Sequence, residues 1–431
     1  MSEFFLKKKI SFETKPTVEN YILQFKNVSF LNDHQNVILK NVSFNIKKGS
    51  FTSFLGPIGC GKTTILGLIA GFEKPSEGEI LFEKKNLVSI SIQERPIYTI
   101  FQDYALFEDL TIYENISFGL RARNFKKPKI LKLIYSLLLF LNLKDSFLWK
   151  NLLNDKIRVK QLSGGQKQQI AIFRALVVVF ATNHNRNDII LLLDEPFSSQ
   201  KSSAIDLRAL QRKFKEKSEI TFIMVTHDPQ DAFFLSDTIL VMNEEGIQQI
   251  DSPKNIYDTP VNSWVAGFVG GVNVIKNAVF IKDHLVCFDN KEFRCLDAGF
   301  GENEKDIDVV IRPEDINFVS HEKGFFRGKI ISIFFKGSIW EVIFESYLFQ
   351  RRYLVHTTTN YQLGTEISIA WEDNAIHVMW KEEKDIVLKN EIFNRKMKFI
   401  LWFFKKNWLC NFFIFAYSFI FNFFSTCFDF F

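Results

Sequence analysis

Nine residues near the N-terminus, Gly56–Thr64 with the sequence GPIGCGKTT, strongly constrain what this chain can fold into. The apolar, β-prone run Ser50–Leu55 precedes them, and the helix-prone run Thr64–Ala70 follows. A backbone rich in glycine can curl so that several N–H groups converge on one anion, and the N-terminus of a helix adds partial positive charge. The stretch therefore predicts a phosphate-binding loop between a strand and a helix of an α/β nucleotide-binding domain.

The residue types in this loop suit a nucleoside triphosphate. Lys62 brings a full positive charge to the β- and γ-phosphates, and the hydroxyl of Thr63 can bind Mg²⁺. The candidate nucleotide-binding residues of the loop are Gly56, Pro57, Ile58, Gly59, Cys60, Gly61, Lys62, Thr63 and Thr64.

Two apolar runs later in the chain end in ionisable side chains. Ile189–Pro196 (IILLLDEP) carries Asp194 and Glu195 near its end, and Ile220–Asp228 (ITFIMVTHD) carries His227. Continuous apolar runs are typical of parallel strands buried on both faces, and open α/β sheets bind ligands at the C-terminal ends of such strands. Asp194 can hold Mg²⁺, Glu195 can polarise the attacking water and His227 can contact the γ-phosphate. We therefore predict that Glu195 and His227 are catalytic.

A glutamine and a serine–glycine motif are further candidates. Gln102 follows the short apolar run Ile97–Phe101, where an amide can reach a metal ion or a water; an ordinary surface glutamine is the alternative. The stretch Gln161–Leu176 (QLSGGQKQQIAIFRAL) is typical of an amphipathic helix. The start of that helix contains Ser163, Gly164, Gly165 and Gln166. Its free N–H groups, hydroxyl and dipole suit an anion, although a plain helix cap has the same chemistry.

Size and composition exclude several other classes. The 431 residues have room for two or three domains. The net charge of +5 is modest and no basic stripe has interleaved aromatic residues, so we expect no nucleic-acid partner. The five cysteines are scattered without metal-ligand spacing, which favours a reducing, intracellular setting. The N-terminal residues lack the long apolar core and cleavage site of a secretory signal.

Together and in this order, the motifs resemble those of the ATP-hydrolysing subunit of an ABC transporter. GPIGCGKTT resembles Walker A, Gln102 the Q-loop glutamine, LSGGQ the signature, ILLLDEP Walker B and His227 the switch histidine. The resemblance covers about residues 21–382 and implies that the chain binds ATP and Mg²⁺.

The same resemblance implies a shared site. In such subunits ATP lies between the phosphate loop of one copy and the signature residues of a second copy, here Ser163–Gln166. By the same analogy, Gln102 contacts the nucleotide, and Thr63, Gln102 and Asp194 lie at the metal ion.

The family also implies a domain order. We expect a flexible lead over 1–20, an α/β P-loop ATPase domain with a helical subdomain over 21–265, an all-β OB-like regulatory domain over 266–382, and a Phe-rich tail of unknown role over 383–431. Such ATPases work as homodimers on the cytoplasmic face of the membrane, attached peripherally to two permease subunits and only indirectly to an extracellular or periplasmic solute-binding protein. The segment Tyr104–Leu143 would receive the permease's coupling helix.

The second half of the chain narrows the resemblance. Ile311–Asp315 (IRPED), together with FKGSIWEVIFE, VHTTT and IHVM, is most similar to the spermidine/putrescine importer ATPases. ATPases of sulfate, ferric-iron and sugar importers share the first half and remain alternatives. A non-transporting regulator of ABC type is a further alternative.

Some features depart from the family pattern. Lys201 stands where the family has the aspartate of its D-loop, and no aromatic ring for adenine is obvious near Asn32 and Asp33. The helix after LSGGQ carries Phe173 where alanine is usual, together with Gln169 where arginine is usual. These departures leave the predicted phosphate contacts and catalytic groups unchanged.

The C-terminal tail contains an uncharged stretch, Trp408–Phe428, of 21 residues. That length can span a bilayer, but its polar residues dilute the apolar character. A read-through remnant, a membrane attachment and a partner-binding helix are the alternatives.

Overall fold

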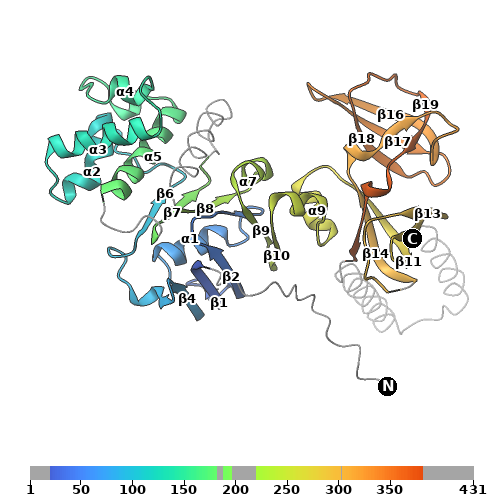
Figure 1. Ribbon diagram of the computed structural model, residues 1–431, viewed down its shortest axis with the longest axis horizontal. Helices are drawn as coiled ribbons and strands as arrows, with labels where there is room; N and C mark the ends of the chain where they lie inside the picture. Colours follow the sequence, from blue (N-terminus) through green and yellow to red (C-terminus); the bar gives the residue numbers. More distant parts are fainter. Residues whose placement is uncertain (1–19, 182–187, 197–219, 302, 382–431) are drawn as a thin grey trace, which may run out of the picture. The chain divides into compact units, whose positions relative to one another are not determined.

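Figure 1 shows a computed structural model, which describes residues 20–181, 188–196, 220–301 and 303–381. Lys201 and the tail 383–431 lie outside these ranges, as do nearly all of the residues of the expected N-terminal lead. Residues as far as Met379 belong to one compact unit. No helix in the described part of the chain is both long and apolar enough to cross a membrane.

A six-stranded sheet forms the centre of the ATPase domain, in the order β10-β9-β3-β8-β7-β6. Its strands are β3 (Phe51–Leu55), β6 (Ile97–Ile100), β7 (Ile190–Asp194), β8 (Thr221–Thr226), β9 (Thr238–Asn243) and β10 (Gly246–Asp251). Strands β9, β3, β8, β7 and β6 run parallel, and only β10 is antiparallel to its neighbour. Every residue of β3 and β8 is buried, as the continuous apolar runs predict.

A second, antiparallel sheet has the order β2-β1-β4-β5. Its strands are β1 (Tyr21–Leu31), β2 (Val37–Lys47), β4 (Glu77–Phe82) and β5 (Lys85–Asn86). Phe25 stacks on Phe44 with ring centroids 4.3 Å apart, and Phe44 meets Phe54 of β3 edge-on at 5.3 Å. These rings join the two sheets in one core that also includes helix α1 (Lys62–Ala70).

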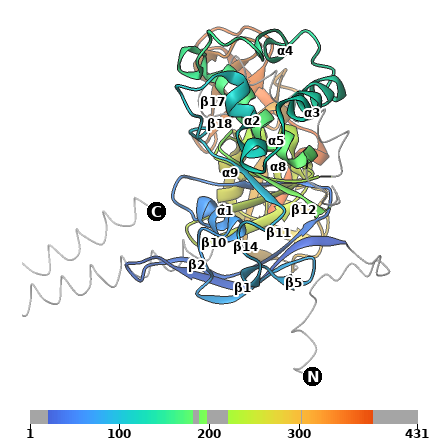
Figure 2. The ribbon, with the colours of Figure 1, turned by 90° about the vertical axis from the view of Figure 1, so that its left-hand side faces the viewer.

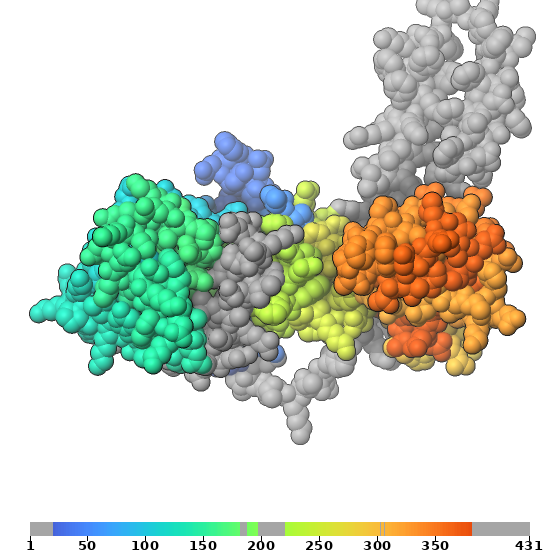
Figure 3. Space-filling model, turned by 90° about the horizontal axis from the view of Figure 1, so that it is seen from above, coloured from blue at the N-terminus to red at the C-terminus, as the bar shows by residue number. Residues whose placement is uncertain are grey.

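Four helices form the helical subdomain, which lies together in teal and green in Figures 1 and 2. They are α2 (Ile112–Ala122), α3 (Lys127–Phe140), α4 (Phe147–Asn151) and α5 (Gly164–Ala181). The buried side chains of α3, Ile130, Ile134, Leu137 and Leu138, recur with helical spacing and share one core with Phe173 of α5. The space-filling view shows the subdomain as a continuous surface (Figure 3).

The β-rich domain consists of two five-stranded sheets, with the orders β13-β12-β11-β14-β20 and β15-β19-β16-β17-β18. The first contains β11 (Asn273–Lys282), β12 (Leu285–Phe288), β13 (Lys291–Arg294), β14 (Glu304–Ile311) and β20 (Ile376–Trp380). The second contains β15 (Asn317–Val319), β16 (Phe326–Phe335), β17 (Trp340–Ser346), β18 (Arg352–Thr357) and β19 (Glu366–Ala370). Both sheets contribute to one core, in which Trp371 contacts Phe293 and Phe326. The predicted all-β class of this domain is confirmed.

Helix α7 (Pro229–Leu235) joins β8 to β9 within the ATPase sheet, and two short helices, α8 (Pro253–Asp258) and α9 (Ser263–Val269), lead from β10 to the β-rich domain. Arg312, the arginine of the IRPED sequence, is only 5% exposed and donates hydrogen bonds to the carbonyls of Tyr257, Ala266 and Gly271. The IRPED arginine therefore ties the β-rich domain to α8, to α9 and to the segment that follows α9.

Candidate functional site

The predicted site residues follow the C-terminal ends of neighbouring strands of the central sheet. In the parallel register, Leu55 of β3 lies opposite Thr226 of β8, and Asp194 of β7 lies opposite Val225 of β8. Gly56, Glu195 and His227 begin the segments that leave these three strands, and Gln102 follows β6 at the next position in the sheet. The sheet therefore brings these residues to one edge.

The glycines of the loop leave room for an anion beside the backbone. Gly59 and Gly61 have φ angles of 89° and 94°, in the left-handed region that glycine adopts without strain. A Cβ on Gly56 would lie 2.2 Å from the carbonyl oxygen of Met242, so no larger residue fits there. A Cβ on Gly59 would meet nothing within 4 Å, so phosphate oxygens have space to approach this part of the loop. The loop therefore fits the polyphosphate of a nucleotide.

Lys62 lies inside this loop at the first position of α1. Its side chain is 4% exposed, and its Nζ donates hydrogen bonds to the carbonyl oxygens of Gly56 at 2.8 Å and Pro57 at 2.6 Å. Thr63, the next residue of the helix, is exposed. The ammonium group and the free N–H groups of the helix start therefore lie beside the same loop, where they can bind phosphate oxygens.

Glu195 and His227 are in direct contact. Nδ1 of His227 lies 3.1 Å from Oε1 of Glu195, and the Glu195 side chain is 17% exposed while His227 is 47% exposed. Glu195 has a φ of 43°, which costs a non-glycine residue backbone strain, and its N–H donates to the carbonyl of Val225 at 3.0 Å. This strained turn holds the carboxylate beside the histidine at the edge of the sheet.

The electrostatics around Asp194 suit a cation. Burial raises the pKa of Asp194 above its usual range, the adjacent charge of Glu195 acts in the same direction, and Lys62 acts in the opposite one. A divalent ion would relieve the repulsion between the two carboxylates. No group of three or more His, Cys, Asp or Glu side chains among the described residues could hold a metal alone. One carboxylate with a hydroxyl and an amide fits Mg²⁺, which keeps waters and substrate phosphates as its other ligands.

Comparisons with known proteins agree with this geometry. Residues 39–198 match the family model described as ABC transporter. The spermidine/putrescine import ATP-binding protein PotA of Mycoplasma capricolum is 44% identical, over 85% of this chain and 99% of that protein. This chain belongs to the PotA family of ABC transporter ATP-binding proteins. The PotA protein of Spiroplasma citri is also 44% identical, over 85% of this chain and 100% of that protein.

Solved structures similar to this chain include cbiO1 from Clostridium perfringens, described as part of the ABC transporter complex cbiONQ. It is 29% identical, covers 55% of this chain and 91% of its own, and has a TM-score of 0.47.

The signature residues of this PotA-family chain cap the helix that follows them. The N–H of Ser163 donates to Oε1 of Gln166 at 3.1 Å, and the N–H of Gln166 donates to Oγ of Ser163 at 3.4 Å. This reciprocal pair is a capping box at the start of α5. The hydrogen bonds described for Ser163–Gln166 stay within the signature and α5, and none reaches the phosphate loop. The structure thus shows that Ser163 and Gln166 cap α5. The contact of these residues with ATP bound to a second copy stays a prediction.

Two side chains of α5 that our sequence analysis did not select hold segments of the site. Gln168 is buried and its Nε2 donates to the carbonyl of Pro196, the residue after Glu195. Arg174 donates to the carbonyls of Tyr104 and Ala105 at 2.6 Å each, in the turn after Gln102. All three partners are backbone carbonyls far away in the chain, so no local sequence signal could have revealed them.

The structure explains some departures from the family pattern. Phe173 is fully buried in the core of the helical subdomain, so it fills space there. Oδ1 of Asn32 accepts the N–H groups of His34 and Asn36, which shapes the turn between β1 and β2. Asn32 therefore has a local structural role in this turn. The substitution at Lys201 lies outside the described residues.

Proposed function

We propose that this chain is the ATP-hydrolysing subunit of an ABC importer for polyamines such as spermidine and putrescine. The observation that carries the proposal is the arrangement of the phosphate loop, Asp194, Glu195 and His227 along one sheet edge, in a chain whose PotA relatives match it over 85% of its length. On this proposal it works as a homodimer with two permease subunits, peripherally at the cytoplasmic face of the membrane. A solute-binding protein would act indirectly.

The residues of the chain would divide the chemistry as follows. The backbone N–H groups of Gly56–Thr64 and the ammonium of Lys62 bind the phosphates. Residues Ser163–Gln166 of a second copy complete this nucleotide-binding site. Glu195 accepts a proton from the attacking water, and His227 orients that carboxylate and contacts the γ-phosphate. Thr63, Gln102 and Asp194 would hold Mg²⁺, which neutralises charge that develops on the phosphates.

The transported solute can be tested in the reconstituted complex. The chain with its permeases and binding protein should hydrolyse ATP at least about fivefold faster when spermidine is present, because solute binding and ATP hydrolysis are coupled. The measurement is phosphate release in proteoliposomes with spermidine, putrescine, sulfate, ferric iron or maltose. Stimulation by sulfate, ferric iron or maltose alone would assign the chain to an importer of that solute. Purification of the chain without any permease would favour the non-transporting regulator.

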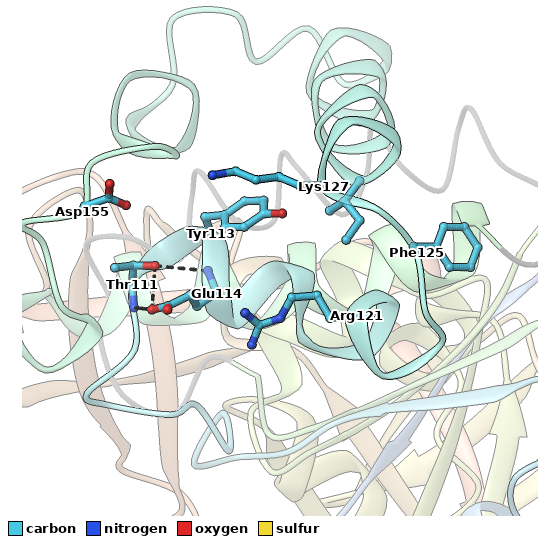
Figure 4. Close-up of a pocket in the computed structure, with 8 residues that line it drawn as sticks. Thr111, Tyr113, Glu114, Arg121, Phe125, Lys127 and Asp155 are labelled. Atoms are coloured by element: carbon cyan, nitrogen blue, oxygen red, sulfur yellow. Dashed lines mark hydrogen bonds between the residues drawn. The ribbon is translucent and has the colours of Figure 1, made fainter.

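We further propose that the permease contacts the helical subdomain next to the Gln102 turn. Phe107 and Phe118 are each 42% exposed, and their ring centroids lie 4.5 Å apart. Glu114 and Arg121 lie on the same side of α2 as Phe118, at spacings of four and three residues. They line a hollow of about 320 Å³ in which Lys127 lies over the ring of Tyr113 (Figure 4). Exposed aromatic side chains beside a charged hollow suit a helix that presents both apolar and polar groups.

Replacing Phe107 with glutamate should release the subunit from membranes that contain the permeases. The buried side chain of Asn115 hydrogen-bonds both the N–H and the carbonyl of Phe107, so the backbone should keep its position in the variant. We expect affinity for the permeases to fall at least about tenfold, measured by co-sedimentation with permease vesicles. Leu363→Glu, at a 70% exposed position between β18 and β19 of the β-rich domain, is the matched control. Equal binding of both variants would contradict this surface.

A further inference from the structure

Tyr257, on α8, contacts the β-rich domain on one side and the ATPase domain on the other. Its hydroxyl donates to Oε1 of Glu314, and the guanidinium carbon of Arg312 lies 4.0 Å from its ring centroid. Its ring meets that of Phe233 on α7 edge-on, with centroids 6.0 Å apart and an interplanar angle of 89°. One aromatic side chain therefore links the two domains.

The contacts from the β-rich domain are held firmly. Nε and Nη2 of Arg312 both donate to the carbonyl of Tyr257, at 3.2 and 2.7 Å, so this guanidinium fixes the backbone as well as the ring of Tyr257. Glu314 also faces His356 of β18, with Nδ1 3.5 Å from Oε2. Burial raises the pKa of the Tyr257 hydroxyl and the Glu314 carboxylate raises it further, so the hydroxyl keeps its proton and remains a donor.

The contact on the other side leads to the catalytic pair. Helix α7, which carries Phe233, begins at Pro229, two residues after His227. The side chain of Asp228 between them accepts the N–H of Gln230 and so caps this helix. Ala232 of α7 packs in one buried cluster with Ile256 of α8. Because α7 is short and packed directly on α8, a displacement of Tyr257 would shift the N-terminal end of α7. His227, two residues before that end, would shift with it.

We propose that Tyr257 is a positioning residue through which the β-rich domain sets the orientation of His227 relative to Glu195. The inference rests on the proposed function, in which His227 and Glu195 act together in ATP hydrolysis. It assigns to the junction a role in turnover, in addition to its role in holding the domains together.

The test is a comparison of leucine variants in the full chain assembled with its permeases. Tyr257→Leu removes the hydroxyl and both ring contacts, so we expect kcat for ATP to fall about tenfold, as displacement of a catalytic group does. The KM for ATP should stay within about twofold, because the phosphate loop is untouched. Tyr361→Leu is the matched control, since Tyr361 has a ring contact inside the β-rich domain, with Phe318 at 4.8 Å.

A conservative variant guards against a simple loss of folding. Tyr257→Phe keeps the contacts of the ring with Arg312 and Phe233 and loses one hydrogen bond, so kcat should fall by about threefold at most. Thermal unfolding of each variant reports stability separately. A loss of stability in Tyr257→Leu with kcat unchanged would overturn the proposal, because it would leave Tyr257 only a structural role.

A double-mutant cycle with His227→Ala decides the mechanism. If Tyr257 acts through His227, Tyr257→Leu should change kcat by less than about twofold in the His227→Ala background, because the two effects are not additive. The same tenfold loss in both backgrounds would overturn the inference and leave the role of His227 standing. If His227→Ala by itself leaves kcat unchanged, both the proposed catalytic role of His227 and the inference fail.

Discussion

Glu195→Gln should reduce kcat for ATP hydrolysis by about 100-fold or more while ATP still binds, because the amide cannot accept a proton from the attacking water. The substitution keeps the size of the side chain. Its amide can still hydrogen-bond His227, which lies 3.1 Å from the carboxylate in the native chain. Glutamine also adopts the φ of 43° at this position as readily as glutamate does, so the strained turn should be retained. Steady-state phosphate release and binding of a fluorescent ATP analogue measure the two properties separately.

A second carboxylate beside the site provides the control. Asp228 follows His227 directly, and Asp228→Asn removes the same charge while an asparagine can still cap α7. This variant should keep kcat within about threefold, since its side chain has no part in proton transfer. Hydrolysis by Glu195→Gln at the rate of Asp228→Asn would remove Glu195 from the role of general base.

Much of the central fold could be predicted from local patterns. The run Ile189–Pro196 is apolar over the length of a strand, and β7 begins one residue later than the start of that run. The boundaries were less accurate, since the helix predicted from Thr64 begins two residues earlier, at Lys62. Apolar periodicity marks the middle of an element, whereas capping contacts decide where it ends.

The candidate site could be predicted from the sequence at positions where a single side chain has a chemical role and lies next to an apolar strand. Asp194 ends a recognisable strand, Lys62, Glu195 and His227 follow such strands, and the parallel register then places these residues together. Arg174 was missed because an arginine on an amphipathic helix gives no indication of which carbonyls it binds, and its partners lie 69 and 70 residues away. The IRPED arginine was noticed by resemblance alone, and the structure gives its physical reason in three carbonyl groups at the domain junction.

Lys62→Ala should weaken ATP binding by about 10- to 100-fold, the range for losing charge-assisted hydrogen bonds to phosphate. The substitution also removes the two hydrogen bonds from Nζ to the carbonyls of Gly56 and Pro57, which brace the loop from inside. Isothermal titration with ATP, ADP and AMP separates the two effects. A missing charge at the β- and γ-phosphates weakens ATP and ADP and has little effect on AMP, whereas a collapsed loop weakens all three.

We expect the first of these patterns, because the neighbouring residues hold the loop independently of Lys62. The backbone at Gly56 lies so near Met242 that a Cβ there would be 2.2 Å from the Met242 carbonyl oxygen, and its N–H donates to the carbonyl of Thr226 in the next strand with an N···O distance of 3.4 Å. Lys85→Ala, which removes an exposed lysine on β5 away from the loop, is the matched control and should leave ATP affinity within about twofold. An equal loss of AMP and ATP affinity in Lys62→Ala would show that Lys62 acts mainly as a structural brace. The charge would then have to come from the helix start alone, which supplies about half a unit and falls off within one turn.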